Sequence, residues 1–102
     1  MILIHIITEK KKQALEIIRL LTNEKLILNA IISKKTMFQN ENILTKKKQI
    51  LIIGQTKGLL FKRINDILSS KYAHKVPMIY SLPIIYMKED QTDFIRVNTA
   101  KI

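Results

Sequence analysis

The stretch YAHKVPMIY, residues 72–80, carries the side chains of this sequence that are best suited to binding a ligand. His74 is one of only two histidines, and Tyr72 and Lys75 lie within two positions of it. Imidazole is a common metal ligand, but it holds a divalent ion only when further ligands converge on the same point. We therefore predict a candidate ligand site at Tyr72, His74 and Lys75, with His74 as the candidate metal ligand. The competing interpretation is a surface turn, because the neighbouring lysine disfavours a bound cation.

No group of residues in the sequence predicts catalysis. His5 stands alone in the apolar stretch ILIHIIT, which is typical of a core or interface histidine. Gly54 and Gly58 bracket QTK, but the order of a phosphate-binding GxxxxGK[ST] loop is missing. No serine has the surroundings of a nucleophile motif. We expect a binding protein and no enzyme.

Length and composition limit the possible classes of protein. The 102 residues fit one domain, residues 1–102, with 87–102 as a C-terminal tail or short helix. The absence of cysteine excludes disulfides and thiolate metal sites. No apolar run reaches the length of a membrane span, and the first residues lack the pattern of a signal peptide. We expect a cytoplasmic protein with no membrane association.

The net charge of +10 allows two interpretations. The runs Lys10–Lys12 and Lys46–Lys48 could bind nucleic acid or another acidic partner by charge alone. They could equally be solvated surfaces, which the ratio of fifteen lysines to three arginines favours. An RNA-binding sheet also needs aromatic residues on its central strands, and residues 2–8 and 49–56 contain none. Nucleic acid binding therefore remains the second alternative.

Hydrophobic periodicity predicts six elements. Short apolar runs predict strands, and apolar residues three and four apart, as at Ala14, Ile17, Ile18 and Leu21, predict helices. Thr8 is the expected cap of the first helix and Asn23 its left-handed stop. Gly54 is expected to mark a bulge or the end of a strand, and Pro83 an edge strand or a bulge. The expected strands are 2–8, 26–33, 49–56 and 76–86; the helices are 9–25 and 57–72; the polar residues 34–48 form a connection, and 88–102 a weak helix or loosely docked tail.

This order predicts an α+β, ferredoxin-like βαββαβ sandwich, in which two helices cover one face of an antiparallel sheet. The first strand, however, is apolar on both sides, with Ile2, Ile4 and Ile6 on one and Leu3 and Ile7 on the other. Leaving several large aliphatic side chains in water would forgo about 1.5–3 kcal/mol each. We therefore expect another copy of the sheet to cover the second face.

The sequence resembles the CutA family of divalent-cation-tolerance proteins, which is related in architecture to the PII signalling proteins. The similar segments are EKLILNAII, the QTK after the third strand, and YAHKVPMI, and they cover residues 1–86 in order and spacing. The resemblance implies a ferredoxin-like homotrimer that binds a small ligand or a divalent cation such as copper and acts in metal response or signalling. It also implies a site in the clefts between subunits, made by the connection 34–48 and the turn Tyr72–Lys75.

Several positions depart from the family pattern. Leu28, Asn29 and Ala30 stand where the family typically has a cysteine, and Met78 stands where a glutamate usually follows the proline. A basic run replaces an acidic, tryptophan-containing segment between the second and third strands. Each departure removes a metal ligand or an acidic group. We therefore expect a diverged member whose metal ligands are largely absent.

Overall fold

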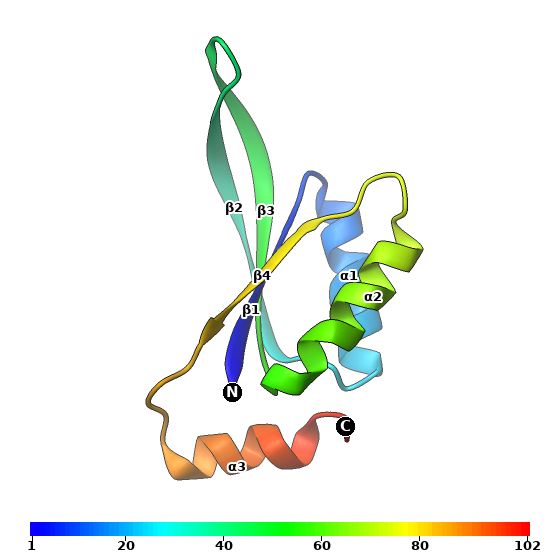
Figure 1. Ribbon diagram of the computed structural model, residues 1–102, viewed down its shortest axis with the longest axis vertical. Helices are drawn as coiled ribbons and strands as arrows, with labels where there is room; N and C mark the ends of the chain where they lie inside the picture. Colours follow the sequence, from blue (N-terminus) through cyan, green and yellow to red (C-terminus); the bar gives the residue numbers. More distant parts are fainter.

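The computed structural model describes all residues from Met1 to Ile102 as one sheet with three α-helices. Figure 1 shows two helices beside the sheet, a long hairpin projecting away from them, and a third helix at the opposite end. None of the three helices has the length and apolar character of a membrane span. The strands are β1 (Ile2–Thr8), β2 (Leu28–Asn40), β3 (Leu44–Thr56) and β4 (Met78–Pro83); the helices are α1 (Lys11–Asn23), the 3-10 turn η1 (Gly58–Leu60), α2 (Phe61–Lys71) and α3 (Glu89–Asn98).

The sheet confirms the predicted ferredoxin-like fold. Its strand order is β2-β3-β1-β4, and all three neighbouring pairs are antiparallel. β4 is an edge strand, as predicted from Pro83, since proline has no N–H to donate to a further strand. The strand is shorter than the predicted 76–86, since only Met78 to Pro83 pair with β1.

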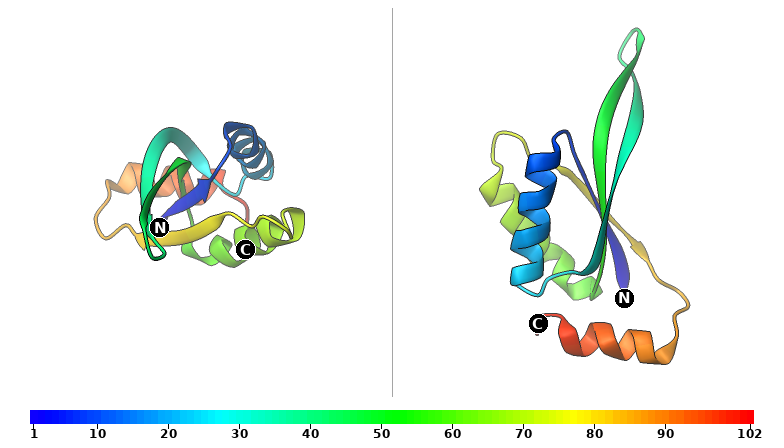
Figure 2. Two further views of the ribbon diagram at one scale, coloured as in Figure 1. Left: turned by 90° about the horizontal axis from the view of Figure 1, so that it is seen from above. Right: turned by 180° about the vertical axis from the view of Figure 1, so that it is seen from behind.

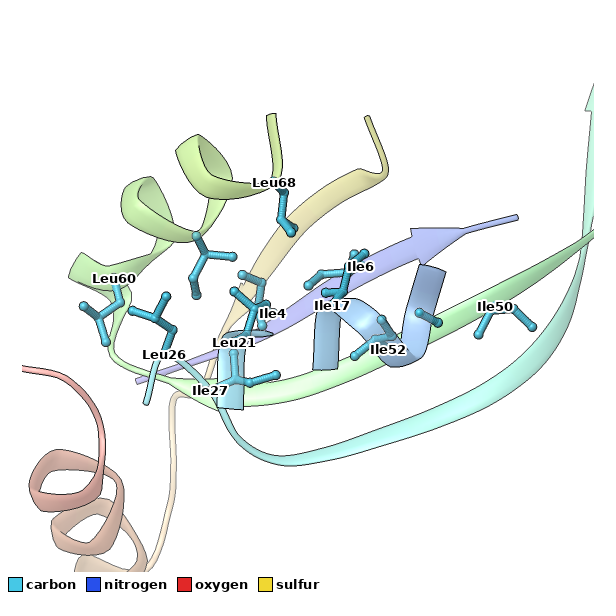
Figure 3. Packing of buried hydrophobic residues seen from close by; sticks show 12 residues of the cluster. Ile4, Ile6, Ile17, Leu21, Leu26, Ile27, Ile50, Ile52, Leu60 and Leu68 are labelled. Carbon is cyan, nitrogen blue, oxygen red and sulfur yellow. The ribbon is translucent and has the colours of Figure 1, made fainter. Parts of the chain in front are cut away.

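Both α1 and α2 pack on the same face of the sheet, as Figure 2 shows. Their apolar stripes meet the alternate residues of β1 and β3 that point toward them, and the side chains fill one core (Figure 3). Burying each large aliphatic side chain contributes about 1.5–3 kcal/mol. The core comprises Ile4, Ile6, Ala14, Ile17, Leu21, Leu26, Ile27, Ile50, Ile52, Leu60, Ile64 and Leu68.

The predicted connection at residues 34–48 is wrong. These residues form the outer halves of β2 and β3, which pair continuously from Ile31↔Ile53 to Asn40↔Leu44. The hairpin turns at Asn42, whose φ of 95° is left-handed. The apolar alternation that identifies a strand is missing because this part of the ribbon projects beyond the helices, so neither face needs apolar residues.

Two predicted ends of α1 need correction. The Thr8 side chain does not cap the helix; its hydroxyl donates to the carbonyl of Lys10 at 3.3 Å, and α1 begins after Lys10 with no side-chain cap. The helix does end at Asn23, but the left-handed residue is Lys25, with φ 57°. A backbone hydrogen bond from Leu26 to the carbonyl of Leu21 closes this turn without an asparagine.

Gly54 lies inside β3, paired with Ile4, so it does not end the strand, but it stands opposite a bulge, which was the other predicted role. The register of β2 shifts between Leu28 and Ile31, whose partners Gln55 and Ile53 flank Gly54. A Cβ at Gly54 would lie 3.1 Å from the Cβ of Ile27. The glycine therefore permits close approach of the chain that enters β2.

The C-terminal segment forms a helix that is tied to the body. Ile95 of α3 is buried, and Ala100 N donates to Lys25 O at 2.7 Å. The ammonium of Lys57 donates to the carbonyls of Thr99 and Ala100 at 3.4 and 3.0 Å. Of the two predicted forms, the weak helix is the one that the structure adopts.

Candidate functional site

The turn between α2 and β4 holds the three predicted site residues. The backbone N–H of Lys75 donates to the carbonyl of Tyr72 at 3.0 Å, which closes the turn. Gln13 of α1 donates its side-chain amide to the Lys75 carbonyl at 3.4 Å. The turn is therefore held against the first turns of α1.

Tyr72 is anchored to the same helix. Its hydroxyl donates to a carboxylate oxygen of Glu16 at 3.0 Å, and the ammonium of Lys71 lies 5.8 Å from the centre of its ring. Partial burial, followed by the hydrogen bond to Glu16 and the charge of that carboxylate, raises the pKa of Tyr72 to about 12. The phenol is thus a neutral hydrogen-bond donor at physiological pH and no ready metal ligand.

Lys75 points toward the start of α1. Its ammonium lies 3.2 Å from a carboxylate oxygen of Glu9, and both side chains are more than half exposed. Solvent screens such a pair, which contributes at most about 1 kcal/mol. The pair can therefore open to admit a ligand at small cost.

His74 lacks the partners that a metal site needs. Its side chain is exposed and makes no hydrogen bond, and no group of three histidine, cysteine, aspartate or glutamate side chains in the chain could hold a metal ion. The structure therefore brings Tyr72 and Lys75 into contact with α1 but leaves His74 apart from other ligands. The donor set of a single subunit does not fit a divalent cation.

A hollow of about 170 Å³ lies where the hairpin, the start of α1 and the turn meet. The sequence predicted that residues 34–48 and the turn contribute to one site, and the structure places them on the same hollow. It did not identify most of the lining side chains. The lining is Ile7, Thr8, Glu9, Gln13, Met37, Gln39, Lys47, Gln49, Lys75, Val76, Pro77 and Met78.

Gln49 is the lining residue that sequence reasoning missed most clearly. Its exposed fraction is only 8%, yet its side-chain amide makes no hydrogen bond within the chain. No fully sealed side-chain polar atom in the structure lacks a partner, so this amide faces the hollow and not a dry core. A sequence signal existed, because Gln49 is in phase with the apolar Leu51 and Ile53 of the same strand face.

A second hollow of about 340 Å³ adjoins the first and shares Gln13 and Lys75 with it. It is also lined by Lys10, Lys12, Glu16 and Tyr72. The two hollows together are lined by four lysines and two glutamates, and both glutamates are already engaged, one by Lys75 and one by Tyr72. The surroundings of the turn are therefore electropositive.

Comparison with known proteins identifies the family. A model of the CutA1 divalent ion tolerance protein family matches residues 2–98. The chain belongs to the CutA1 family. No curated protein sequence matches it.

Solved CutA1 structures share the fold along the whole chain. CutA1 from Pyrococcus horikoshii superposes with a TM-score of 0.87 at 20% identity, covering 99% of this chain and 100% of the other. The Thermus thermophilus protein gives 0.85 at 21%, covering 98% of this chain and 100% of the other. The Archaeoglobus fulgidus protein, described as a periplasmic divalent cation tolerance protein, gives 0.84 at 21%, covering 96% and 98%.

The helix-free face of the sheet in this CutA1 chain is apolar, as predicted. One row across it runs Ile31, Ile53, His5 and Tyr80. His5 Nδ1 lies 3.3 Å from the Tyr80 hydroxyl, which gives one ring nitrogen a partner within the row. Four large side chains of this face are substantially exposed in the single subunit: Ile31 (61%), Met78 (55%), Leu82 (44%) and Tyr80 (40%).

Proposed function

We propose that this protein is a homotrimeric ligand-binding and regulatory member of the CutA1 family, with a role in the response to divalent ions and no catalytic activity. One observation carries the proposal. The helix-free face exposes a continuous apolar surface at the sheet centre and edge, including Ile31 and Met78. Leaving these side chains in water would forgo about 1.5–3 kcal/mol each, so a cover by further copies is favoured.

The hollow lies at the border of this surface. Ile7 and Met78 line the hollow, and they are also paired neighbours on the helix-free face. A second copy packed on that face would therefore stand beside the hollow. This supports a binding site in the cleft between subunits, made by the hairpin and the turn Tyr72–Lys75.

The side chains of one subunit do not fit a divalent cation, because His74 is isolated and the surrounding charge is positive. We propose that the response does not run through a metal centre within one subunit. Titration of copper into the monomeric Ile31→Lys variant tests this: saturable heat there that disappears when His74→Ala is added would contradict it.

Light scattering coupled to size exclusion tests the assembly. We expect the mass of three chains at micromolar concentration. Ile31→Lys places a charge on the helix-free face and should yield monomers that remain folded, since this side chain is 61% exposed within the subunit. Leu59→Lys is the matched control: Leu59 is 74% exposed but lies on η1, and the trimer should persist. A wild-type monomer would overturn the proposal.

A further inference from the structure

We propose that the hollow between the hairpin and the turn binds a small oxyanion, such as a phosphate or a short carboxylate. The inference concerns the ligand of the proposed intersubunit site and rests on the proposed function only for its location. A divalent cation is the occupant that the family description would suggest. The side chains that line this hollow favour the opposite charge.

The charged side chains that line the hollow are mainly positive. Lys47 from the hairpin and Lys75 from the turn line the hollow, and Glu9 is its only carboxylate. The ammonium of Lys75 already lies 3.2 Å from Glu9, which neutralises that carboxylate in part. Lys10 and Lys12 extend the positive surface into the adjoining hollow. An anion entering here meets an attractive field, whereas a cation is repelled.

The side chain of Gln49 is more than nine-tenths buried, yet its amide makes no hydrogen bond within the chain. The amide is open to the hollow, where water or a ligand can satisfy it. Its amide N–H groups can donate to an oxyanion, as can the ammonium groups of the lining lysines. The hollow thus offers several donors and one engaged carboxylate, which is the donor set of an anion site.

The start of α1 reinforces the same preference. The helix has no side-chain cap and no acidic residue in its first turn. Its first intrahelical bond is from Ala14 N to Lys10 O at 3.1 Å, so the N–H groups just before Ala14 have no helical acceptor. The positive end of the helix dipole therefore lies beside the lysines that line both hollows.

Volume limits the ligand. The hollow measures about 170 Å³, which is well above the space that one water molecule needs. An inorganic phosphate or a short carboxylate fits this space. A longer ligand would have to extend into the adjoining hollow along Gln13 and Lys75, which both hollows share.

Calorimetric titration of inorganic phosphate, and separately of acetate, tests the proposal on the purified full chain. We expect saturable binding of phosphate that weakens by about tenfold in Gln49→Leu and in Lys75→Gln, which corresponds to the loss of one good hydrogen bond. Lys62→Gln is the matched control, because Lys62 is exposed and pairs with Asp66 outside both hollows. Binding by this variant should be unchanged.

Glu9→Gln decides the sign of the ligand charge. Removing the carboxylate should tighten phosphate binding by several-fold, because the anion no longer meets a negative group and Lys75 is released. The same change would weaken the binding of a cation. Weaker phosphate binding in Glu9→Gln, or copper binding that depends on Glu9, would overturn the inference, as would phosphate binding that no hollow variant changes.

Light scattering on the same samples separates this inference from the proposed function. A trimer that gives no saturable heat with phosphate or acetate would overturn the oxyanion site and leave the assembly standing. A monomer that binds phosphate through Gln49 and Lys75 would overturn the assembly and support the site. Circular dichroism checks that Gln49→Leu, a buried change, is folded; Lys75→Gln is exposed and provides the same test without a buried substitution.

Discussion

Both faces of the sheet carry large aliphatic side chains, but the faces differ in what covers them. On the helix side, Ile4, Ile6 and Ile52 have no exposed surface under α1 and α2. On the other side, Ile31 and Met78 are more than half exposed in the single subunit. The helices therefore cover one face only. An apolar second face is informative because an exposed sheet face usually alternates to polar residues.

Alanine substitutions on the two faces should have different effects. Ile52→Ala leaves a cavity beneath the helices, and we expect it to lower the free energy of unfolding by about 2–5 kcal/mol at any protein concentration. Ile31→Ala should act only through assembly, so its effect should depend on protein concentration. Urea unfolding at two concentrations measures both. If both variants lost the same free energy of unfolding at both protein concentrations, the proposed difference between the faces would be contradicted.

Gly54 tests how tightly the helix-covered face is packed. Gly54→Ala would place a Cβ 3.1 Å from the Cβ of Ile27, which belongs to the core and has no exposed surface. We expect a loss of about 1–3 kcal/mol, since the neighbouring chain must shift. Gly58→Ala is the control, because its Cβ would meet only Ile2 at 3.7 Å. Thermal unfolding of the two variants compares the sites directly, and equal midpoints would contradict the crowding at Gly54.

The helix-covered face of the sheet was predictable because local periodicity determines it. Ala14, Ile17 and Leu21 repeat at helical spacing, and the strand faces alternate, so the fold class follows from patterns within short segments. The outer hairpin was not predictable in this way. Residues 34–48 touch no core, so neither of their faces needs apolar residues, and only the backbone pairing identifies them as strands.

The candidate site shows a similar division. The turn Tyr72–Lys75 was predicted from its residue types. Its contacts were not, because its partners Glu16 and Glu9 lie 56 and 66 positions earlier in the chain. Gln49 was missed because its burial depends on the turn and the hairpin meeting, which is a tertiary property. Whether His74 takes part remains a prediction, since a neighbouring subunit would have to supply its partners.

Lys57 ties the segment that follows α3 to the end of the sheet. Its partly buried ammonium donates to two carbonyls, those of Thr99 and Ala100. We expect Lys57→Met to cost about 1–2 kcal/mol and to speed amide hydrogen exchange in residues 95–101. Arg63→Met is the control, because Arg63 makes one exposed bond to Lys101 O at 3.3 Å. Unchanged exchange in the Lys57 variant would show that α3 is held by its apolar contacts alone.

The smallest expected effect on the free energy of unfolding is at the turn, where the side chain of Tyr72 is only partly buried. Its pKa of about 12 exceeds the value of about 10 in the unfolded chain, so the folded state retains a proton that the unfolded state loses. This stabilisation is fully present below about pH 10 and is lost as the pH rises toward about 12. Because solvent screens the group, we expect a contribution below about 1 kcal/mol. Lysines titrate in the same range, so the measured quantity is the difference between wild type and Tyr72→Phe in urea unfolding across this window. Ultraviolet titration of tyrosinate should also show a lower pKa for Tyr72 in Glu16→Gln; an unchanged titration would show that burial alone raises it.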